Sequence, residues 1–191
     1  MSDRPVLLGI SGSLRKASHC TAILKNTVDA TESRATLEFF PLDAVPLYNQ
    51  DLDNESPPES VTALRQAIER AAGLVIVTPE YNYGMSGVLK NALDWASRPY
   101  GKSKLKGKAV LTLSASPAFT GGVRAQAQLN ETLLSNAALL VLRPQIVIGM
   151  VHEKIRDGRV VDQETARFIS EGLNDLLRDI ASKATVADQE A

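Results

Sequence analysis

The sequence contains few of the residues that form disulfides or bind metals: one cysteine, Cys20, and two histidines, His19 and His152. A single cysteine excludes an internal disulfide and agrees with a reducing compartment. Metal sites usually combine several cysteine, histidine or carboxylate ligands at short spacings, and these three residues form no such set. We therefore predict no metal site from the sequence.

Net charge and long apolar runs are also lacking. The formal net charge is −1, which gives no general attraction to nucleic acid or to an anionic membrane. No apolar run approaches the roughly 18 residues that span a bilayer, and residues 1–5 do not resemble a signal peptide. We expect a cytoplasmic protein with no membrane or nucleic-acid partner.

The length and composition are those of one soluble globular domain. The chain has 191 residues, of which 44% are apolar and 23% are charged, enough to bury a full core. No linker, repeat or low-complexity segment divides it. We predict a single domain over residues 1–191, with a disordered polar tail at 184–191.

Short apolar runs alternate with amphipathic runs along the chain. The runs at 6–10, 73–78 and 108–114 lack polar alternation, as in strands buried on both faces of a parallel sheet. The alternation predicts an α/β fold, a doubly wound five-stranded parallel sheet with helices on both faces. The expected strands are 6–10, 37–40, 73–78, 108–114 and 144–148, and the expected helices are 21–30, 61–71, 85–96, 123–138 and 168–180.

Ligands of such sheets bind beyond the carboxyl ends of the strands, where the strand order reverses. The loop after the first strand, residues 11–18, combines one glycine, three serines, an arginine and a lysine. Converging N–H groups, the Arg15 guanidinium and the start of a helix near Ser18 would suit a phosphate monoester. The other interpretation is a turn capped by Ser18 without a ligand, and this loop alone leaves both open.

The loop after the third strand is rich in aromatic and polar residues. We expect Pro79 to end that strand and residues 80–84 to form a compact loop, which could offer amides, carbonyls and an aromatic ring to a flat heterocycle. In the helix that follows, Leu89, Leu93 and Trp95 are expected in the core or in an interface.

The loop after the fourth strand contains Gly121 and Gly122, which would let the backbone approach a planar ring closely, or would form an ordinary connector. Arg124 follows and is a candidate for a subunit contact or for binding nucleotide phosphates. Four lysines at 102, 104, 106 and 108 form either a solvated loop or a patch that attracts anionic substrates.

Three segments together resemble the NADPH-dependent FMN reductase family, which has a flavodoxin-like fold and includes quinone, chromate and azo reductases. These segments are GSLRKAS at 12–18, PEYNYGMSGVLKNALDW at 79–95, and SASP at 114–117 followed by GGVR at 121–124. They occur in the family's order and span residues 12–124. The resemblance implies an enzyme that binds FMN and uses NAD(P)H as electron donor.

The resemblance also implies the residues that would bind FMN. Ser13, Arg15 and Ser18 would hold the phosphate. Residues 80–83 would border the flavin ring, and Ser116 and the segment up to Gly122 would line its other edge. The full set of expected cofactor residues is Ser13, Leu14, Arg15, Lys16, Ser18, His19, Cys20, Pro79, Glu80, Tyr81, Asn82, Tyr83, Gly84, Ser116 and Gly121.

The chain departs from the family at the end of the first loop, where Cys20 replaces a frequent asparagine and His19 replaces an apolar residue. Cys20 is either a small buried residue or a thiol activated by the helix N-terminus and sensitive to oxidation.

No Ser–His–Asp set is present, so the expected chemistry belongs to the flavin, with Tyr83 as the one candidate for an assisting catalytic residue. The resemblance implies ping-pong transfer to quinones, or to chromate, ferric, azo or nitro compounds, in a homodimer or homotetramer whose contacts lie at 41–58 and 85–98. The alternatives are a flavodoxin-type electron carrier and an FMN-binding module without reductase activity. The sequence selects neither the physiological acceptor nor NADPH over NADH.

Overall fold

A computed structural model describes residues 4–31 and 34–189. Its central sheet is parallel and has the order β2-β1-β3-β5, formed by Thr36–Phe40, Val6–Ser11, Gly73–Tyr81 and Ala109–Ala115. Two short strands, β6 (Leu139–Leu140) and β7 (Ile146–Ile148), pair in parallel with β5 one after the other. They share the fifth position, so the predicted five-stranded doubly wound sheet is confirmed, with its last strand split in two.

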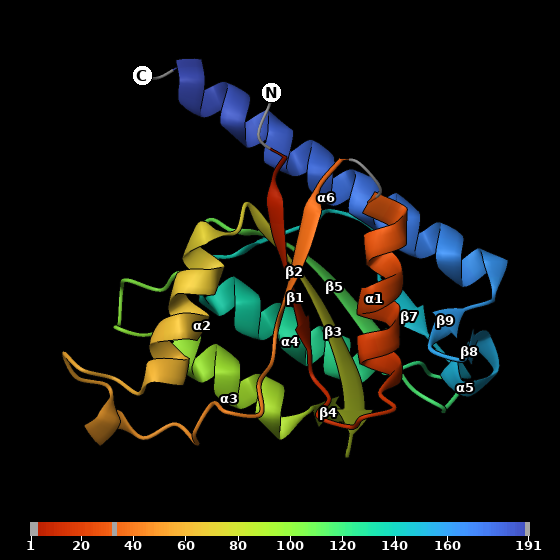
Figure 1. Ribbon diagram of the computed structural model, residues 1–191, viewed down its shortest axis with the longest axis horizontal. Helices are drawn as coiled ribbons and strands as arrows, with labels where there is room; N and C mark the ends of the chain where they lie inside the picture. Colours follow the sequence, from red (N-terminus) through yellow and green to blue (C-terminus); the bar gives the residue numbers. More distant parts are fainter. Residues whose placement is uncertain (1–3, 32–33, 190–191) are drawn as a thin grey trace.

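Helices cover both faces of the sheet (Figure 1). On one face lie α2 (Glu59–Arg70), α3 (Gly87–Ala96) and α4 (Val123–Ser135), and on the other lie α1 (His19–Thr31) and α6 (Gln163–Gln189). A short 3-10 helix, η1 (Gln50–Leu52), lies in the loop before α2. The helix α5 (Val151–Lys154) and the hairpin of β8 (Ile155–Arg156) and β9 (Arg159–Val160) lie beside α1.

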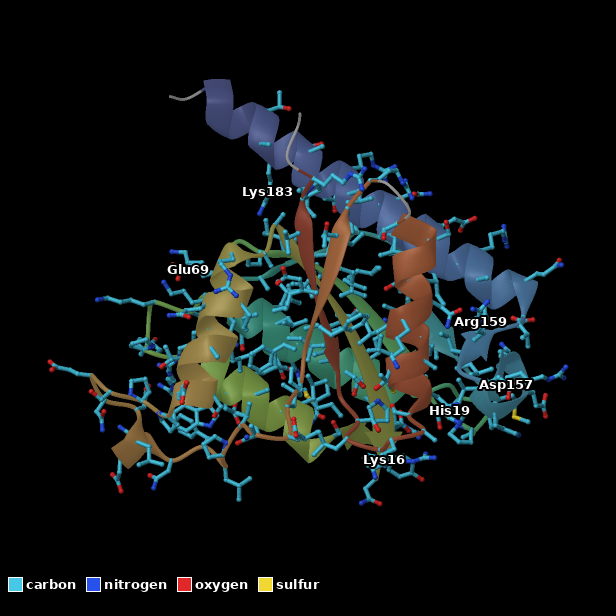
Figure 2. All side chains as sticks on the ribbon, viewed as in Figure 1. Lys16, His19, Glu69, Asp157, Arg159 and Lys183 are labelled. Carbon is cyan, nitrogen blue, oxygen red and sulfur yellow. The ribbon has the colours of Figure 1, made fainter. Side chains whose placement is uncertain are left out.

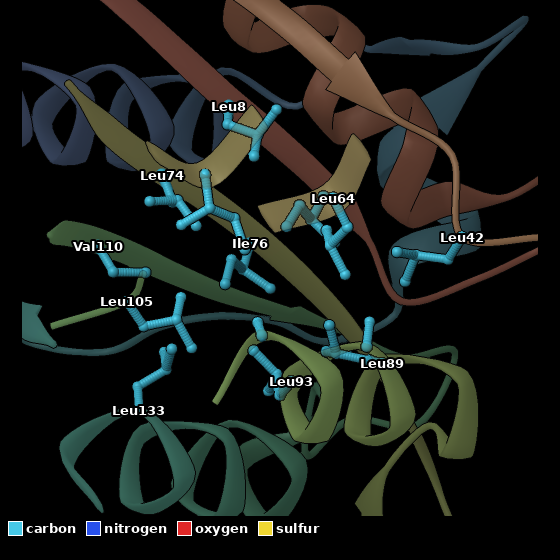
Figure 3. Close-up of a cluster of buried hydrophobic side chains, with 14 of the residues drawn as sticks. Leu8, Leu42, Leu64, Leu74, Ile76, Leu89, Leu93, Leu105, Val110 and Leu133 are labelled. Atoms are coloured by element: carbon cyan, nitrogen blue, oxygen red, sulfur yellow. The ribbon is translucent and has the colours of Figure 1, made fainter. Parts of the chain in front are cut away.

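The strands contribute alternate residues to two cores. On the face of α2, α3 and α4, Leu74 and Ile76 of β3 pack with Leu64, Leu89 and Leu133 (Figure 3). The neighbouring residues of the same strand point to the core beneath α1 and α6. Because both faces of the strand are buried, its sequence has no polar alternation.

Several predicted boundaries are wrong, and two of them bear on the site. Strand β3 continues through Pro79 to Tyr81. The pairing of β3 with β1 ends at Val77, so the missing N–H of Pro79 interrupts no hydrogen bond to β1. Helix α3 begins at Gly87 instead of residue 85, because the Ser86 side chain caps it by accepting a hydrogen bond from the Leu89 N–H.

The predicted tail is also different in the structure. Helix α6 continues to Gln189, so residues 184–189 are helical, and residues 190–191 lie outside the described part of the chain. Adding a residue to an existing helix is far easier than starting one, and alanine and glutamine favour it. Within the described residues, no helix is long and apolar enough to cross a membrane.

Candidate cofactor site

The strand order reverses between β1 and β3, because the chain goes from β1 to β2 on one side and later places β3 on the other. The turn after β1 and the segment at the end of β3 therefore lie side by side at the carboxyl edge of the sheet. The loop after β5 follows beside them. This is the arrangement of the three loops that the sequence predicts.

Gly12 anchors the first turn to β3 and α3. Its N–H donates to the Val77 carbonyl at 2.8 Å, and its own carbonyl accepts a hydrogen bond from the Ser86 hydroxyl at 2.5 Å. A Cβ at position 12 would lie 3.0 Å from Cδ of Pro79, so a larger side chain would push the turn away from β3. The side chains of Pro79, Ser86 and Leu89 therefore leave little room for any residue larger than glycine here.

The same turn presents hydrogen-bond donors that have no protein partner. The N–H groups of Leu14, Lys16 and Ala17 and the guanidinium of Arg15 make no hydrogen bond or ion pair with any residue that the structure describes. The Ser13 side chain accepts a hydrogen bond from the Arg15 N–H at 3.4 Å. A phosphate needs such a set of donors gathered in one turn.

Ser18 is the N-cap of α1. Its hydroxyl oxygen accepts a hydrogen bond from the Thr21 N–H at 3.2 Å, and its carbonyl accepts one from the Ala22 N–H. The predicted cap is therefore present, with or without a ligand. It leaves the free donors of residues 14–17 unexplained, because the cap uses none of them.

A cavity of about 430 Å³ separates the first turn from the end of β3. Among its lining residues Leu14 and Val88 are apolar, Tyr81 is aromatic and Arg15 is cationic. Ser86, Gly87 and Val88 are not among the predicted site residues, although a serine before a helical apolar pattern is a recognisable N-cap signal. The full lining is Gly12, Ser13, Leu14, Arg15, Tyr81, Ser86, Gly87 and Val88.

The predicted compact loop at 80–84 is a tight β-hairpin. Glu80 pairs with Met85 and Tyr81 with Gly84, so that β4 (Gly84–Met85) runs antiparallel to β3. The two turn residues, Asn82 and Tyr83, have φ values of 50° and 65°. A two-residue hairpin turn with positive φ at both positions is favoured by asparagine at the first. Tyr81 and Tyr83 are 52% and 72% exposed, so both rings are available to a ligand or a partner.

The side chain of Glu80 points to α4. Its Oε2 accepts hydrogen bonds from the N–H groups of Arg124 and Ala125, both at 3.1 Å. The Arg124 guanidinium lies over the Tyr83 ring, 4.3 Å from its centroid. The hairpin and the first turn of α4 are therefore joined by a capping carboxylate and a cation–π contact.

The third loop packs against the segment after β7. Gly121 has a φ of 62°, and a Cβ there would lie 2.5 Å from Cγ1 of Val147. Ser116 is buried, and its hydroxyl oxygen accepts a hydrogen bond from the Ala118 N–H. Neither Ser116 nor Gly121 lines the cavity described above.

Lys16 and His19 face a different cavity, of about 340 Å³, between the start of α1 and the β8–β9 hairpin. Figure 2 shows both side chains at the lower edge of the molecule, on the side of Asp157. The pKa of His19 is lowered, first by burial and then by the nearby charges of Arg15 and His152. The imidazole is therefore neutral at pH 7 and adds no charge to the turn.

Cys20 lies in the core beneath α1 and α6, with 3% of its surface exposed. Burial raises the pKa of the thiol to about 12. The helix N-terminus does not overcome this desolvation, and the thiolate that oxidation needs is scarce near neutral pH. The structure favours the first of the two interpretations, a small buried residue.

The four lysines lie at the other edge of the sheet. Lys108 directly precedes β5, and its ammonium donates to the carbonyls of Glu69 and Ala71, while Lys104 pairs with the Glu69 carboxylate. Figure 2 shows Glu69 at the opposite end of the molecule from Lys16. Two of these lysines therefore bind the end of α2, and none lines the candidate site.

The site fits FMN in its chemistry. The Leu14 N–H and the Arg15 guanidinium offer the donors that a phosphate monoester needs, and Leu14, Val88 and Tyr81 offer the apolar and aromatic contact that a flat ring needs. The hairpin adds main-chain donors and acceptors close by.

A model of the family described as NADPH-dependent FMN reductase matches residues 5–153. The chain belongs to the NADPH-dependent FMN reductase family. It is 37% identical to the NAD(P)H-dependent FMN reductase of Pseudomonas aeruginosa over 177 residues, which are 92% of this chain and 95% of the relative. It is 36% identical to the quinone reductase of Escherichia coli K12 over 169 residues, 86% of this chain and 89% of the relative.

Among solved structures, the chain resembles FerB, a flavoenzyme NAD(P)H:(acceptor) oxidoreductase from Paracoccus denitrificans. The TM-score is 0.82 at 32% identity, covering 93% of this chain and 98% of the FerB chain. The flavodoxin-like fold, the family and its enzymatic character are thereby confirmed, as is FMN as the cofactor with NAD(P)H as the donor.

Proposed function

We propose that this protein is an FMN-dependent NAD(P)H:quinone oxidoreductase that reduces its acceptor by two electrons. The observation that carries the proposal is the cavity between the Arg15 turn and the β3–β4 hairpin. Its lining combines Leu14 and Arg15, whose backbone N–H and guanidinium respectively have no partner among the described residues, with the Tyr81 ring, at the point where the sheet reverses its strand order. Relatives named quinone reductases support the choice of acceptor.

The turn after β1 would hold the phosphate of FMN. The N–H groups of Leu14, Lys16 and Ala17 would donate to its oxygens, the Arg15 guanidinium would neutralise its charge, and Ser13 would add a hydroxyl donor.

Ser18 would act through the start of α1, which it caps. His19 and Cys20 would contribute only as the first residues of that helix, because one is neutral and the other is buried.

The residues from Pro79 to Gly84 would flank the flavin ring, with Tyr81 and Leu14 as apolar contacts and the hairpin backbone as hydrogen-bonding edge. Ser116 and Gly121 would limit the site on the side of β5. When bound, FMN supplies the redox chemistry by accepting a hydride from NAD(P)H and passing two electrons to the acceptor. The protein orients the ring, excludes water from one face and leaves the other open.

Tyr83 is the one side chain proposed to assist the chemistry. Its ring is exposed at the rim of the hairpin and lies beneath the Arg124 guanidinium. A cation over the ring makes its phenol a better hydrogen-bond donor. We propose that this phenol donates a hydrogen bond to an oxygen of the acceptor.

An acceptor panel tests the function. FMN-loaded protein is mixed with NADH or NADPH and with a benzoquinone, a naphthoquinone, chromate, a ferric chelate, an azo dye and a nitroaromatic compound. We expect the quinones to give the highest kcat/KM and parallel double-reciprocal plots, the pattern of ping-pong transfer. FMN-loaded protein that oxidises neither nucleotide in the presence of any quinone would contradict the proposal and favour an electron carrier.

We also propose that the protein is a cytoplasmic homodimer or homotetramer. Support comes from exposed apolar side chains on the hairpin, on the loop after β5, at the start of α4 and in the predicted contact loop 41–58, namely Tyr81, Tyr83, Phe119, Val123 and Leu47. Trp95 is fully buried and donates to the Pro46 carbonyl, so it would shape the 41–58 loop without touching a partner. Light scattering during size-exclusion chromatography would measure the mass, and a monomer at micromolar concentration would contradict the assembly.

A further inference from the structure

The β3–β4 hairpin extends beyond the sheet, and its tip is held by few apolar contacts. Tyr81 and Tyr83 are mostly exposed, and Asn82 is exposed as well. Burial of apolar surface therefore does not by itself fix where the tip lies. Met85 anchors the base of the hairpin in the core, while the rest depends on contacts to α4: the cation–π contact of Arg124 with Tyr83 and two sets of hydrogen bonds.

The first contact is the Glu80 carboxylate at the start of α4. The N-cap of this helix is Gly122, with a φ of 88° and no side chain to accept from the first N–H groups. Glu80, 44 residues from Arg124 in the sequence, accepts from both the Arg124 and the Ala125 N–H. A carboxylate at a helix N-terminus is stabilised by the helix dipole as well as by these two hydrogen bonds.

The second contact is made one helical turn further along. The Gln128 Oε1 accepts a hydrogen bond from the Met85 N–H at 2.8 Å. A Cβ at Gly84 would lie 2.9 Å from the same oxygen, so glycine at 84 leaves room for the contact. Glu80 lies on β3 and Met85 opposite it on β4, so α4 holds both strands of the hairpin.

Helix α4 is itself fixed to the sheet by buried polar side chains. The Gln126 Nε2 donates to the Thr112 carbonyl at 2.9 Å, and the Thr112 hydroxyl donates to Asn130 Oδ1 at 2.7 Å. Gln126 is 1% exposed, so this connection is shielded from water. The hairpin is thus tied to a helix that has little freedom to move relative to β5.

We infer that Glu80 and Gln128 are positioning residues: they hold the hairpin at the distance from the Arg15 turn that the flavin ring requires. The inference rests on the proposed function, which assigns the ring to the hairpin. It adds two roles to that function. Glu80 binds α4 instead of the flavin, and Gln128, which lies outside the motifs of the family resemblance, binds the hairpin. The inference also implies that the N–H groups of Arg124 and Ala125 are not available to a phosphate of NAD(P)H, because the Glu80 carboxylate already accepts from both.

Hydrogen exchange of the apoprotein tests the contact directly and requires no activity. In Glu80→Ala we expect the amides of Arg124 and Ala125 to exchange about tenfold faster, since their acceptor is lost. In Gln128→Ala the amide of Met85 should exchange faster in the same way. Glu80→Gln keeps a carbonyl oxygen as acceptor and should restore most of the protection. Glu131→Ala, at an exposed glutamate on the same helix, is the matched control.

Titration of FMN into the same apoproteins tests the positioning role. We expect the Kd of FMN to rise about tenfold in Glu80→Ala, with a changed visible circular dichroism of the bound flavin, and to stay near the wild-type value in Glu80→Gln and Glu131→Ala. Faster exchange at 124–125 with unchanged FMN affinity and flavin spectrum would make the contact purely structural and overturn the inference. If Glu80→Ala does not fold, Gln128→Ala serves the same comparison. Wild-type protein that binds no FMN would instead contradict the proposed function.

Discussion

Arg15 is the residue on which cofactor affinity should depend most. It is exposed, lines the candidate cavity, and has no ion-pair partner within the described part of the chain. We expect Arg15→Ala to weaken FMN binding about 10- to 100-fold, because a hydrogen bond to a charged group contributes about 1.5–3 kcal/mol. Quenching of FMN fluorescence by the apoprotein measures the Kd. Arg167→Ala, which removes an exposed arginine on α6 paired with Glu171, is the control.

Cys20 gives a pH dependence of stability. Its folded-state pKa of about 12 lies above the ordinary value of 9.0. Below pH 9 the thiol is protonated in both states, so its contribution is fully present there and is lost as the pH rises toward 12. In that range wild type should lose up to about 1.4 kcal/mol per pH unit relative to Cys20→Ala. Urea unfolding of both proteins at pH 8 and 10 measures the difference, and equal losses would contradict the burial of the thiol.

At the scale of elements, the third loop depends on a glycine. Gly121→Ala should destabilise the fold by more than Gly158→Ala. Both positions have positive φ, which costs about 1–2 kcal/mol for any larger residue, but only Gly121 would also place its Cβ against Val147 and Gly149. Gly87→Ala, with open space around it at the start of α3, should be neutral or stabilising.

Denaturant midpoints of the three glycine variants provide the test. Equal losses for the variants at 121 and 158 would show that the third loop yields easily, and that its contact with residues 147–149 is not rigid.

The elements themselves differ in how far their sequence predicts them. The buried strands are evident because both of their faces are apolar, as in β3 up to Thr78. The extension through Pro79 and the hairpin turn at Asn82 and Tyr83 are not evident. Proline is permitted at position 79 because the pairing with β1 ends at Val77, so no hydrogen bond from that N–H is needed. The length of the partner strand, which the sequence of β3 does not reveal, decides this. The capping of α4 by Glu80 is hidden for a similar reason, since the two lie 44 residues apart.

At the scale of the whole molecule, the lysines at 102–108 and the lysines beside the proposed phosphate site lie at opposite edges of the sheet. The strand β5 separates Lys108 from the third loop by about 20 Å at about 3.3 Å per residue. Replacing the exposed Lys102 and Lys106 by alanine should therefore leave kcat/KM for NAD(P)H unchanged at low salt. Replacing Lys16 and Lys25, which lie beside the proposed phosphate site, should lower kcat/KM and weaken its dependence on salt. A loss of the same size in both double variants would contradict this separation.

By itself the sequence determined the fold class, the family and the two loops that line the cavity, because apolar periodicity and the motif residues are local in the chain. It also placed Ser13, Leu14, Arg15 and Tyr81 in one group, and the structure brings these four to one cavity. Only the tertiary structure decided that Cys20 is a buried thiol, that the lysines at 102–108 lie at the far edge, and that Glu80 serves α4. Burial, distance and hydrogen bonding between remote segments exist only once the chain is folded.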